Sequence, residues 1–164
     1  MKYLLFIVLL SFCDACNPFS PALDESVPQN QYGDARTVDG FFQAFRLSYQ
    51  FKDTSVYGKL IAPNFTFSYR NFDRGLDLEW GRSEEMRTTG SLFESAQALD
   101  LLWGNVLDSS GTDTLFDITR SFSLNVTINL GEILHVDGRA IFQLQRKTKD
   151  DPWQAIRWRD ESNF

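Results

Sequence analysis

A long stretch of alternating apolar and polar residues, Phe116 to Ile128, most constrains what this chain can fold into. Its apolar residues share one parity, with a single exception at Arg120: Phe116, Ile118, Phe122, Leu124, Val126 and Ile128. Successive side chains of a strand point to opposite faces, so this pattern predicts a half-buried strand. The same alternation recurs from Leu134 to Leu144. Two such strands predict a sheet with one apolar face, which the rest of the chain must cover.

Two features determine the register and the continuity of the second strand: the turn that joins the two strands, and a glycine within the second strand. A turn of three residues, 130–132, keeps the apolar faces of both strands on one side of the sheet. The pair Asp137-Gly138 is a common hairpin signal, but the apolar parity continues unchanged from Val136 to Ala140. We therefore predict one continuous strand with Gly138 at a bend or bulge.

The composition limits the class of protein. With 164 residues, of which 43% are hydrophobic and 15% aromatic, the chain can bury one core and is expected to form one domain. The net charge of -6 argues against a nucleic-acid partner. Both cysteines, Cys13 and Cys16, lie near the start, so the domain has no thiol for a metal site or a nucleophile. We expect no metal and no cofactor.

The first residues resemble an export signal. Lys2 precedes an apolar run, Leu4 to Leu10, that is too short to span a bilayer, so residues 1–15 are predicted to be a signal peptide. Ala15-Cys16 resembles a bacterial lipobox, which implies lipid attachment at Cys16 and a membrane-anchored lipoprotein of the bacterial cell envelope. Cleavage of the same bond by ordinary signal peptidase would instead give a secreted or periplasmic protein.

Residues 16–36 are predicted to be a linker, because they hold three of the five prolines among polar residues. The domain is expected at residues 37–164. A helix should begin at Thr37 with an aromatic stripe, and a second, short helix should begin at Asp53 or Thr54 and end at Pro63. The remaining elements are expected as follows: strands at 65–69 and 76–80, a helix from Ser83 to Trp103 stopped by Gly104, a polar loop at 108–114, a turn at 149–152 and a last strand at 153–160. This is an α+β chain whose curved antiparallel sheet packs against N-terminal helices.

The order of these elements resembles the cone-shaped nuclear transport factor 2-like superfamily from Thr37 to Ser162. The residues that carry the resemblance lie in the last two strands: Val136, Gly138, Ala140, Phe142, Trp153, Ile156, Arg157, Trp158 and Asp160. The resemblance implies a cone with a usable interior and an open sheet face. The superfamily contains ketosteroid isomerases, scytalone dehydratase, polyketide cyclases and binding modules, so the fold does not select a function.

Two groups of residues are candidates for acid–base chemistry. His135 is the only histidine, but its parity, shared with Asp137 and Arg139, predicts a position on the polar face. Tyr49 and Asp53 lie one helical turn apart and could supply the donor and base of an isomerase. The alternative is an aromatic residue at the end of a helix beside a helix-capping carboxylate.

Arg120 breaks the apolar face of the first long strand, where a guanidinium is costly unless it is paired. Arg146 also has inward parity and lies toward the same end of the sheet, so two arginines at a cavity mouth could hold a carboxylate. The alternative is that Arg120 pairs with an acidic side chain at the rim or extends past the edge.

These observations favour a domain that binds a small apolar or amphipathic ligand, or a protein partner, without catalysis. Its predicted ligand-binding residues are Tyr49, Phe67, Trp103, Arg120, Phe142 and Trp158. The alternative is a cofactor-free lyase or isomerase that acts in the cone through Tyr49, Asp53 and Arg120. A homodimer through the sheet is a further possibility.

Overall fold

The computed structural model describes residues 32–71, 75–129 and 131–162. In this part of the chain, helices and strands follow one another in this order: α1 (Val38–Gln50), α2 (Thr54–Leu60), β1 (Ile61–Asn71), β2 (Leu76–Gly81), α3 (Arg82–Ser95), β3 (Ala98–Gly111), β4 (Leu115–Asn129), β5 (Glu132–Gln145) and β6 (Gln154–Ser162). None of the described helices is long and apolar enough to cross a membrane.

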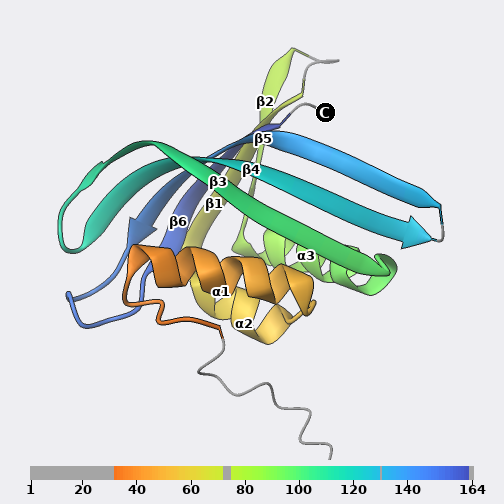
Figure 1. Ribbon diagram of the computed structural model, residues 1–164. Helices are drawn as coiled ribbons and strands as arrows, with labels where there is room; N and C mark the ends of the chain where they lie inside the picture. Colours follow the sequence, from red (N-terminus) through yellow and green to blue (C-terminus); the bar gives the residue numbers. More distant parts are fainter. Residues whose placement is uncertain (1–31, 72–74, 130, 163–164) are drawn as a thin grey trace, which may run out of the picture.

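The strands form one curved sheet with the order β2-β1-β6-β5-β4-β3, and all three helices lie on its concave side (Figure 1). This confirms the predicted α+β class and the cone shape. One detail of the prediction is wrong, because β1 and β6 pair in parallel while the other neighbours are antiparallel. The first strand after the helices thus lies beside the last strand of the chain.

The two long strands confirm the alternation on which the prediction rested. Phe122 pairs with Gly138 and Leu124 with Val136, so the apolar residues of β4 and β5 share the concave face. A register irregularity between Thr127 and Asn129 preserves this parity, and β5 begins already at Glu132, which we had placed in the turn.

Gly138 lies inside one continuous strand, as predicted, but the β4–β5 register has no bulge there. A Cβ atom at Gly138 would lie 2.6 Å from Cα of Ser162 and 2.8 Å from the carbonyl oxygen of Glu161. The glycine is therefore needed for the close approach of the β6 backbone, not for a bend or bulge.

The segment after α3 is a strand, where a helix and a loop were expected. We expected a helix to Trp103 and a polar loop at 108–114, whereas α3 ends at Ser95 and β3 runs from Ala98 to Gly111. Leu99 and Leu101 are buried while Ala98 and Asp100 are exposed, which is the period of a strand. Pairing with β4 stabilises this extended segment over its whole length and outweighs its helical pattern.

The first two helices follow local sequence signals. The Thr37 side chain accepts a hydrogen bond from the Gly40 amide and caps α1, and Asp53 caps α2 by accepting from the amides of Ser55 and Val56. The aromatic stripe of α1 is buried as expected. The second helix is shorter than predicted, since β1 begins at Ile61 and includes Pro63.

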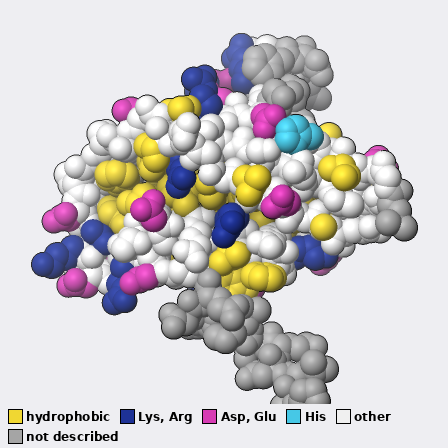
Figure 2. Space-filling view, in the orientation of Figure 1, with side chains coloured by type: hydrophobic (Ala, Val, Ile, Leu, Met, Phe, Trp, Pro, Cys, Tyr) yellow, Lys and Arg dark blue, Asp and Glu magenta, His cyan; other side chains and the backbone are white. Residues whose placement is uncertain are grey.

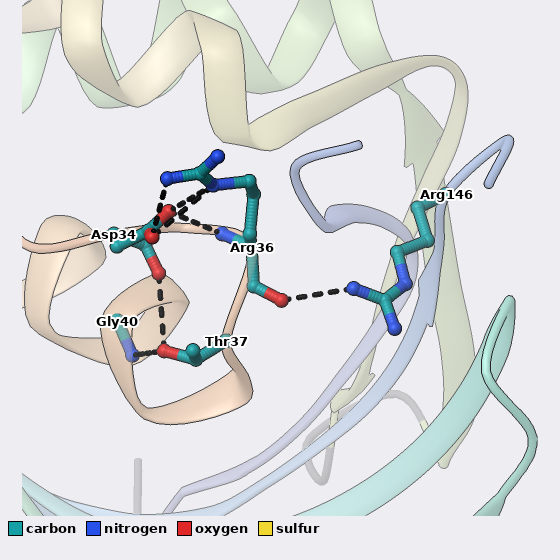
Figure 3. A network of polar contacts seen from close by, with 5 residues as sticks. All are labelled: Asp34, Arg36, Thr37, Gly40 and Arg146. Atoms are coloured by element: carbon teal, nitrogen blue, oxygen red, sulfur yellow. Dashed lines mark hydrogen bonds and ion pairs between the residues drawn. The ribbon is translucent and has the colours of Figure 1, made fainter. Parts of the chain in front are cut away.

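The N-terminal end of α1 is tied to the end of the long hairpin. Arg146 donates through Nη1 to the Arg36 carbonyl at 2.9 Å, and Arg36 in turn pairs with Asp34 (Figure 3). Tyr32 is buried, and its hydroxyl donates to Asp53 at 2.9 Å. Residues from Tyr32 onward thus pack with the domain, before its expected start at Thr37.

Candidate functional site

A cavity of about 450 Å³ lies between the concave face of the sheet and helices α1 and α3. Its wall is mostly aromatic and aliphatic: Phe45, Tyr49, Phe67, Tyr69, Trp80, Leu92, Ala96, Leu101, Trp103, Phe122, Leu124, Val126, Ile128, Leu134, Val136 and Trp158. The polar residues of the wall are few: Glu85, Thr88, Thr89, Ser95 and Asp160. The alternation of β4 and β5 supplies one side of this wall, and the aromatic stripe of α1 supplies another.

The cavity opens between α3 and the turn-side ends of β4 and β5. Four lining residues are exposed there, namely Thr88 and Ser95 on α3, Ile128 on β4 and Leu134 on β5. Ile128 and Leu134 keep 44% and 45% of their surface exposed although they belong to the inward parity. An apolar molecule entering here would cover side chains that the protein itself leaves in water.

Four of the six predicted ligand-binding residues lie in the cavity wall: Tyr49, Phe67, Trp103 and Trp158. Phe142 does not reach the cavity, because it is fully buried behind Trp158 with the two rings stacked at 5.2 Å. Whether any of the four contacts a ligand stays a prediction.

Arg120 also lies outside the cavity wall. Its guanidinium donates through Nε and Nη2 to the Gly104 carbonyl, at 3.3 and 2.9 Å, and lies 4.8 Å from the centre of the Phe42 ring. The sequence suggested that Arg120 holds a ligand carboxylate or, as the alternative, pairs with an acidic side chain at the rim or extends past the edge. In the structure its hydrogen-bond acceptor is a backbone carbonyl.

Arg146 does not join Arg120 at a cavity mouth. It donates to the Asp113 and Arg36 carbonyls, and its guanidinium lies 4.2 Å from the Trp153 ring centre. The expected pair of arginines therefore does not form, because each guanidinium is bound to backbone near its own position.

Tyr49 and Asp53 have different partners and do not act as a pair in this structure. Asp53 is occupied by the α2 cap and by the Tyr32 hydroxyl. Tyr49 stacks on Phe45 at 5.3 Å, and its hydroxyl pairs with Thr89 and Tyr57. Burial and the charge of Glu85 raise the pKa of Tyr49 far above its usual value, so the phenol stays protonated.

Glu85 is a buried carboxylate whose oxygens are all partnered. Tyr57 and Thr89 donate to Oε1, the latter at 2.9 Å, and the Trp80 indole donates to Oε2 at 2.7 Å. Glu85 also lies in the first turn of α3, where a negative charge suits the helix dipole. This network fastens α2, α3 and β2 to one another at the cavity wall.

Asp160 is the polar residue that the sequence analysis missed as a site residue. Burial is the main cause that raises the pKa of its carboxyl to about 6. Oδ2 accepts from the Ser162 hydroxyl at 3.3 Å, whereas Oδ1 is buried without a hydrogen-bond partner in the described structure. The signal was present, because Asp160 follows Trp158 by two residues on one strand, and the indole of Trp158 faces the concave side.

Trp158 contributes a second orphan polar atom. Its side chain is only 9% exposed, and its indole Nε1 has no hydrogen-bond partner among the described residues. A buried donor and a buried carboxylate oxygen, both unpaired and both on residues of the cavity wall, are uncommon in a folded protein. Both atoms are closed off from water, so a molecule in the cavity would reach them only if the side chains turned toward it.

His135 lies on the outer face, as its parity predicted. Its ring nitrogens contact Asn125 at 2.6 Å and Asp137 at 2.8 Å, and the side chain is 54% exposed. Figure 2 shows acidic and basic side chains intermixed on the face that it presents. In this view charge does not single out a binding region. The cavity is the candidate site because of its volume and its apolar wall.

Comparisons with known proteins agree with this architecture. No protein-family model matches the chain, and no curated protein sequence matches it. Among solved structures, a conserved protein of Planctomyces limnophilus has a TM-score of 0.66 at 13% identity, over 76% of this chain and 92% of its own. A candidate scytalone dehydratase of Novosphingobium aromaticivorans has a TM-score of 0.65 at 11% identity, over 79% and 83%.

A further similar structure is a candidate dehydratase of the nuclear transport factor 2-like family from Streptomyces avermitilis, with a TM-score of 0.59 at 16% identity over 77% of this chain and 93% of the other. The chain therefore has the nuclear transport factor 2-like fold, as its sequence had suggested. At these identities the likeness establishes the fold alone.

Proposed function

We propose that the protein binds a small apolar molecule, bearing a limited polar group, in the cavity between the sheet and helices α1 and α3. The observation that carries this proposal is the cavity itself, about 450 Å³ in volume and walled mainly by aromatic and aliphatic side chains. Its size falls within the range of about 300–1,000 Å³ that is usual for small-molecule sites.

The two unpaired polar atoms support a ligand with a polar end. A buried group without a hydrogen bond costs roughly 1–3 kcal/mol. A ligand would offset this cost at Asp160 if the carboxyl group turned toward it, so Asp160 marks where the polar end of the ligand would lie. The rings of Phe67, Trp80 and Trp103 would contact its apolar body.

Catalysis in the same cavity is the second candidate function, and Asp160 is the observation that favours it. A carboxyl whose pKa is raised to about 6 can exchange protons at neutral pH, as a general base must. This shifts the proposed catalytic group away from Asp53 and Arg120, both of which are held outside the cavity. The two candidate dehydratases with this fold make a lyase reaction the first one to test.

The cellular location is a separate proposal and rests on sequence alone. Residues 1–15 and Cys16 lie outside the described residues. We propose a bacterial envelope protein anchored by lipid at Cys16, with the binding domain held away from the membrane by the segment that follows. A protein partner at the sheet, including a second copy of the chain, also stays a proposal.

Thermal unfolding with neutral apolar probes tests ligand binding. Adamantanol, camphor and decanol should raise the melting temperature of the wild type, since a ligand stabilises the state that binds it. Leu124→Phe would narrow the cavity and should abolish the shift, whereas Leu102→Phe, at a position 48% exposed and outside the wall, should leave it intact. Absence of a shift with every probe, or equal shifts in both variants, would contradict the proposal.

A further inference from the structure

The charged groups of the cavity wall are all of one sign. Among the described residues that line it, Glu85 and Asp160 carry acidic side chains, and none carries lysine, arginine or histidine. The cation that we had expected there, Arg120, is bound to the Gly104 carbonyl. An anionic ligand would therefore meet two carboxylates and no counter-charge. The charge of the wall thus argues against the carboxylate ligand that the sequence suggested.

The two carboxylates differ in their availability. Glu85 accepts from Tyr57, Thr89 and Trp80, so its lone pairs are largely used within the protein. Asp160 is hydrogen-bonded by Ser162 alone, through its hydroxyl at 3.3 Å and its backbone amide, and Oδ1, which is closed off from water, has no partner in the described structure. Asp160 therefore keeps more acceptor capacity than Glu85, and its carboxyl group can offer it to a ligand by turning toward the cavity.

No cation lies opposite Asp160 in the sheet. Its neighbour across β5 is Ala140, and its neighbour across β1 is Tyr69. The next residue, Glu161, is paired with Arg139 at 2.7 Å and with Arg159 at 3.4 Å, so these two arginines already have a carboxylate partner. A ligand cation would provide the counter-charge that the protein does not place at Asp160.

The aromatic wall favours the same charge. Phe67 and Trp80 stack at 4.4 Å, Phe67 meets Trp158 edge-on at 4.9 Å, and these three rings line the same cavity as Asp160. Ring faces attract cations and repel anions because of their quadrupole.

We propose that the cavity selects apolar amines in their protonated form, with the ammonium group hydrogen-bonded to Asp160 and the apolar body between the aromatic side chains of α1, β1, β2 and β3. This inference rests on the proposed ligand-binding function and specifies the class of ligand.

Three probes that share the adamantane skeleton separate the effect of charge from that of shape: adamantylamine, adamantanol and adamantane carboxylate. Their affinities for the wild type are measured by titration calorimetry at about pH 7.5, where Asp160 is ionised and the amine is protonated. We expect the amine to bind at least about tenfold more tightly than the alcohol, and the carboxylate to bind most weakly.

Two variants assign the preference to Asp160. In Asp160→Asn the amine should lose its advantage over the alcohol, whereas Glu161→Gln, which removes a charge from the next position of β6, should retain it. If adamantanol binds the wild type but adamantylamine binds no more tightly, the amine inference fails and the proposed function stands. If none of the three binds, the proposed function fails as well.

A measurement on the wild type keeps the inference testable if Asp160→Asn does not fold. An ammonium bound at Asp160 stabilises the carboxylate and lowers its pKa, so binding near pH 6 should release protons. The calorimetric enthalpy then varies with the ionisation enthalpy of the buffer for the amine and not for the alcohol. Proton release that is equal for both probes, or zero for the amine, would overturn the proposal.

Discussion

The guanidinium of Arg120 lies 4.8 Å from the centre of the Phe42 ring and donates two hydrogen bonds to the carbonyl of Gly104. Gly104 lies where the pairing of β3 with β4 is irregular, between Trp103 and Val106. The one residue that breaks the apolar pattern of β4 thus binds a carbonyl at an irregularity of the neighbouring strand and covers the N-terminal part of α1.

This contact predicts that Arg120→Leu lowers the free energy of unfolding by about 1–2 kcal/mol, because the Gly104 carbonyl loses its donors and Phe42 loses its cation. Arg120→Lys should cost less, since it keeps the charge. Chemical denaturation measures both. Adamantanol binding should be unchanged in Arg120→Leu, and a large loss of binding would place Arg120 at the cavity after all.

The Glu85 network predicts a graded loss of stability. Glu85→Ala would leave the donors of Tyr57, Thr89 and Trp80 without an acceptor in a buried position, at a cost of about 3–5 kcal/mol. Glu85→Gln keeps one acceptor oxygen and should cost less. Urea unfolding of the two variants gives the order. Equal costs would mean that packing, not hydrogen bonding, sets the role of Glu85.

Replacement by alanine should have opposite effects on stability at two glycines. A Cβ atom at Gly138 would come within 2.6 Å of the Ser162 backbone, so Gly138→Ala should destabilise the sheet by about 1–3 kcal/mol. Gly90 lies in α3 with nothing within 4 Å of its Cβ position, so Gly90→Ala should stabilise by about 0.5–1 kcal/mol. Melting temperatures that move the same way would contradict this account.

The envelope proposal predicts covalent lipid at Cys16. Metabolic labelling with palmitate should mark the wild type, and Cys16→Ser should remove the label because the thiol is the attachment atom. Cys13→Ser serves as the matched control and should keep it. Labelling that survives in Cys16→Ser, or that is absent from all three proteins, would remove the lipoprotein proposal and favour a secreted or periplasmic protein.

The sequence predicted the sheet well where one face is buried and alternation is strict. Residues 98–103 were misread, because Leu99 and Leu102 fit a helix while Leu99, Leu101 and Trp103 fit a strand, and only pairing with β4 decides between them. Periodicity alone does not separate the two in so short a segment.

The site was predicted only in part, for a physical reason. Parity says which face a side chain takes, and so Tyr49, Phe67, Trp103 and Trp158 were found. It does not say how far from the cavity a residue lies, as Phe142 and Arg120 illustrate. Asp160 was missed because a carboxylate near the end of a strand is usually solvated, and its burial depends on the parallel pairing with β1 that the sequence does not reveal.

Asp160 makes stability depend on pH in a direction unusual for a carboxylate. Burial raises its pKa from the ordinary value of 3.8 to about 6, so the folded protein holds this proton more tightly than the unfolded chain. The ionised group therefore opposes folding at neutral pH. This penalty is relieved as the pH falls through about 6, and the relief is complete below the unfolded value near 4.

The measurable consequence is a comparison of Asp160→Asn with the wild type at two pH values. At about pH 7.5 the variant should be more stable by roughly 2–3 kcal/mol, because asparagine carries no charge to bury. This free energy corresponds to the shift of about two units in the pKa of Asp160. At about pH 4 the difference should largely vanish, since Asp160 is then protonated in the folded protein.

Asp100→Asn, at an exposed position of β3, is the control for the change in net charge and should show no such pH dependence. Urea unfolding at both pH values measures all three proteins. If Asp160→Asn were less stable than the wild type at neutral pH, the carboxylate would have a partner that compensates its burial. The unpaired oxygen on which the amine site depends would then not exist.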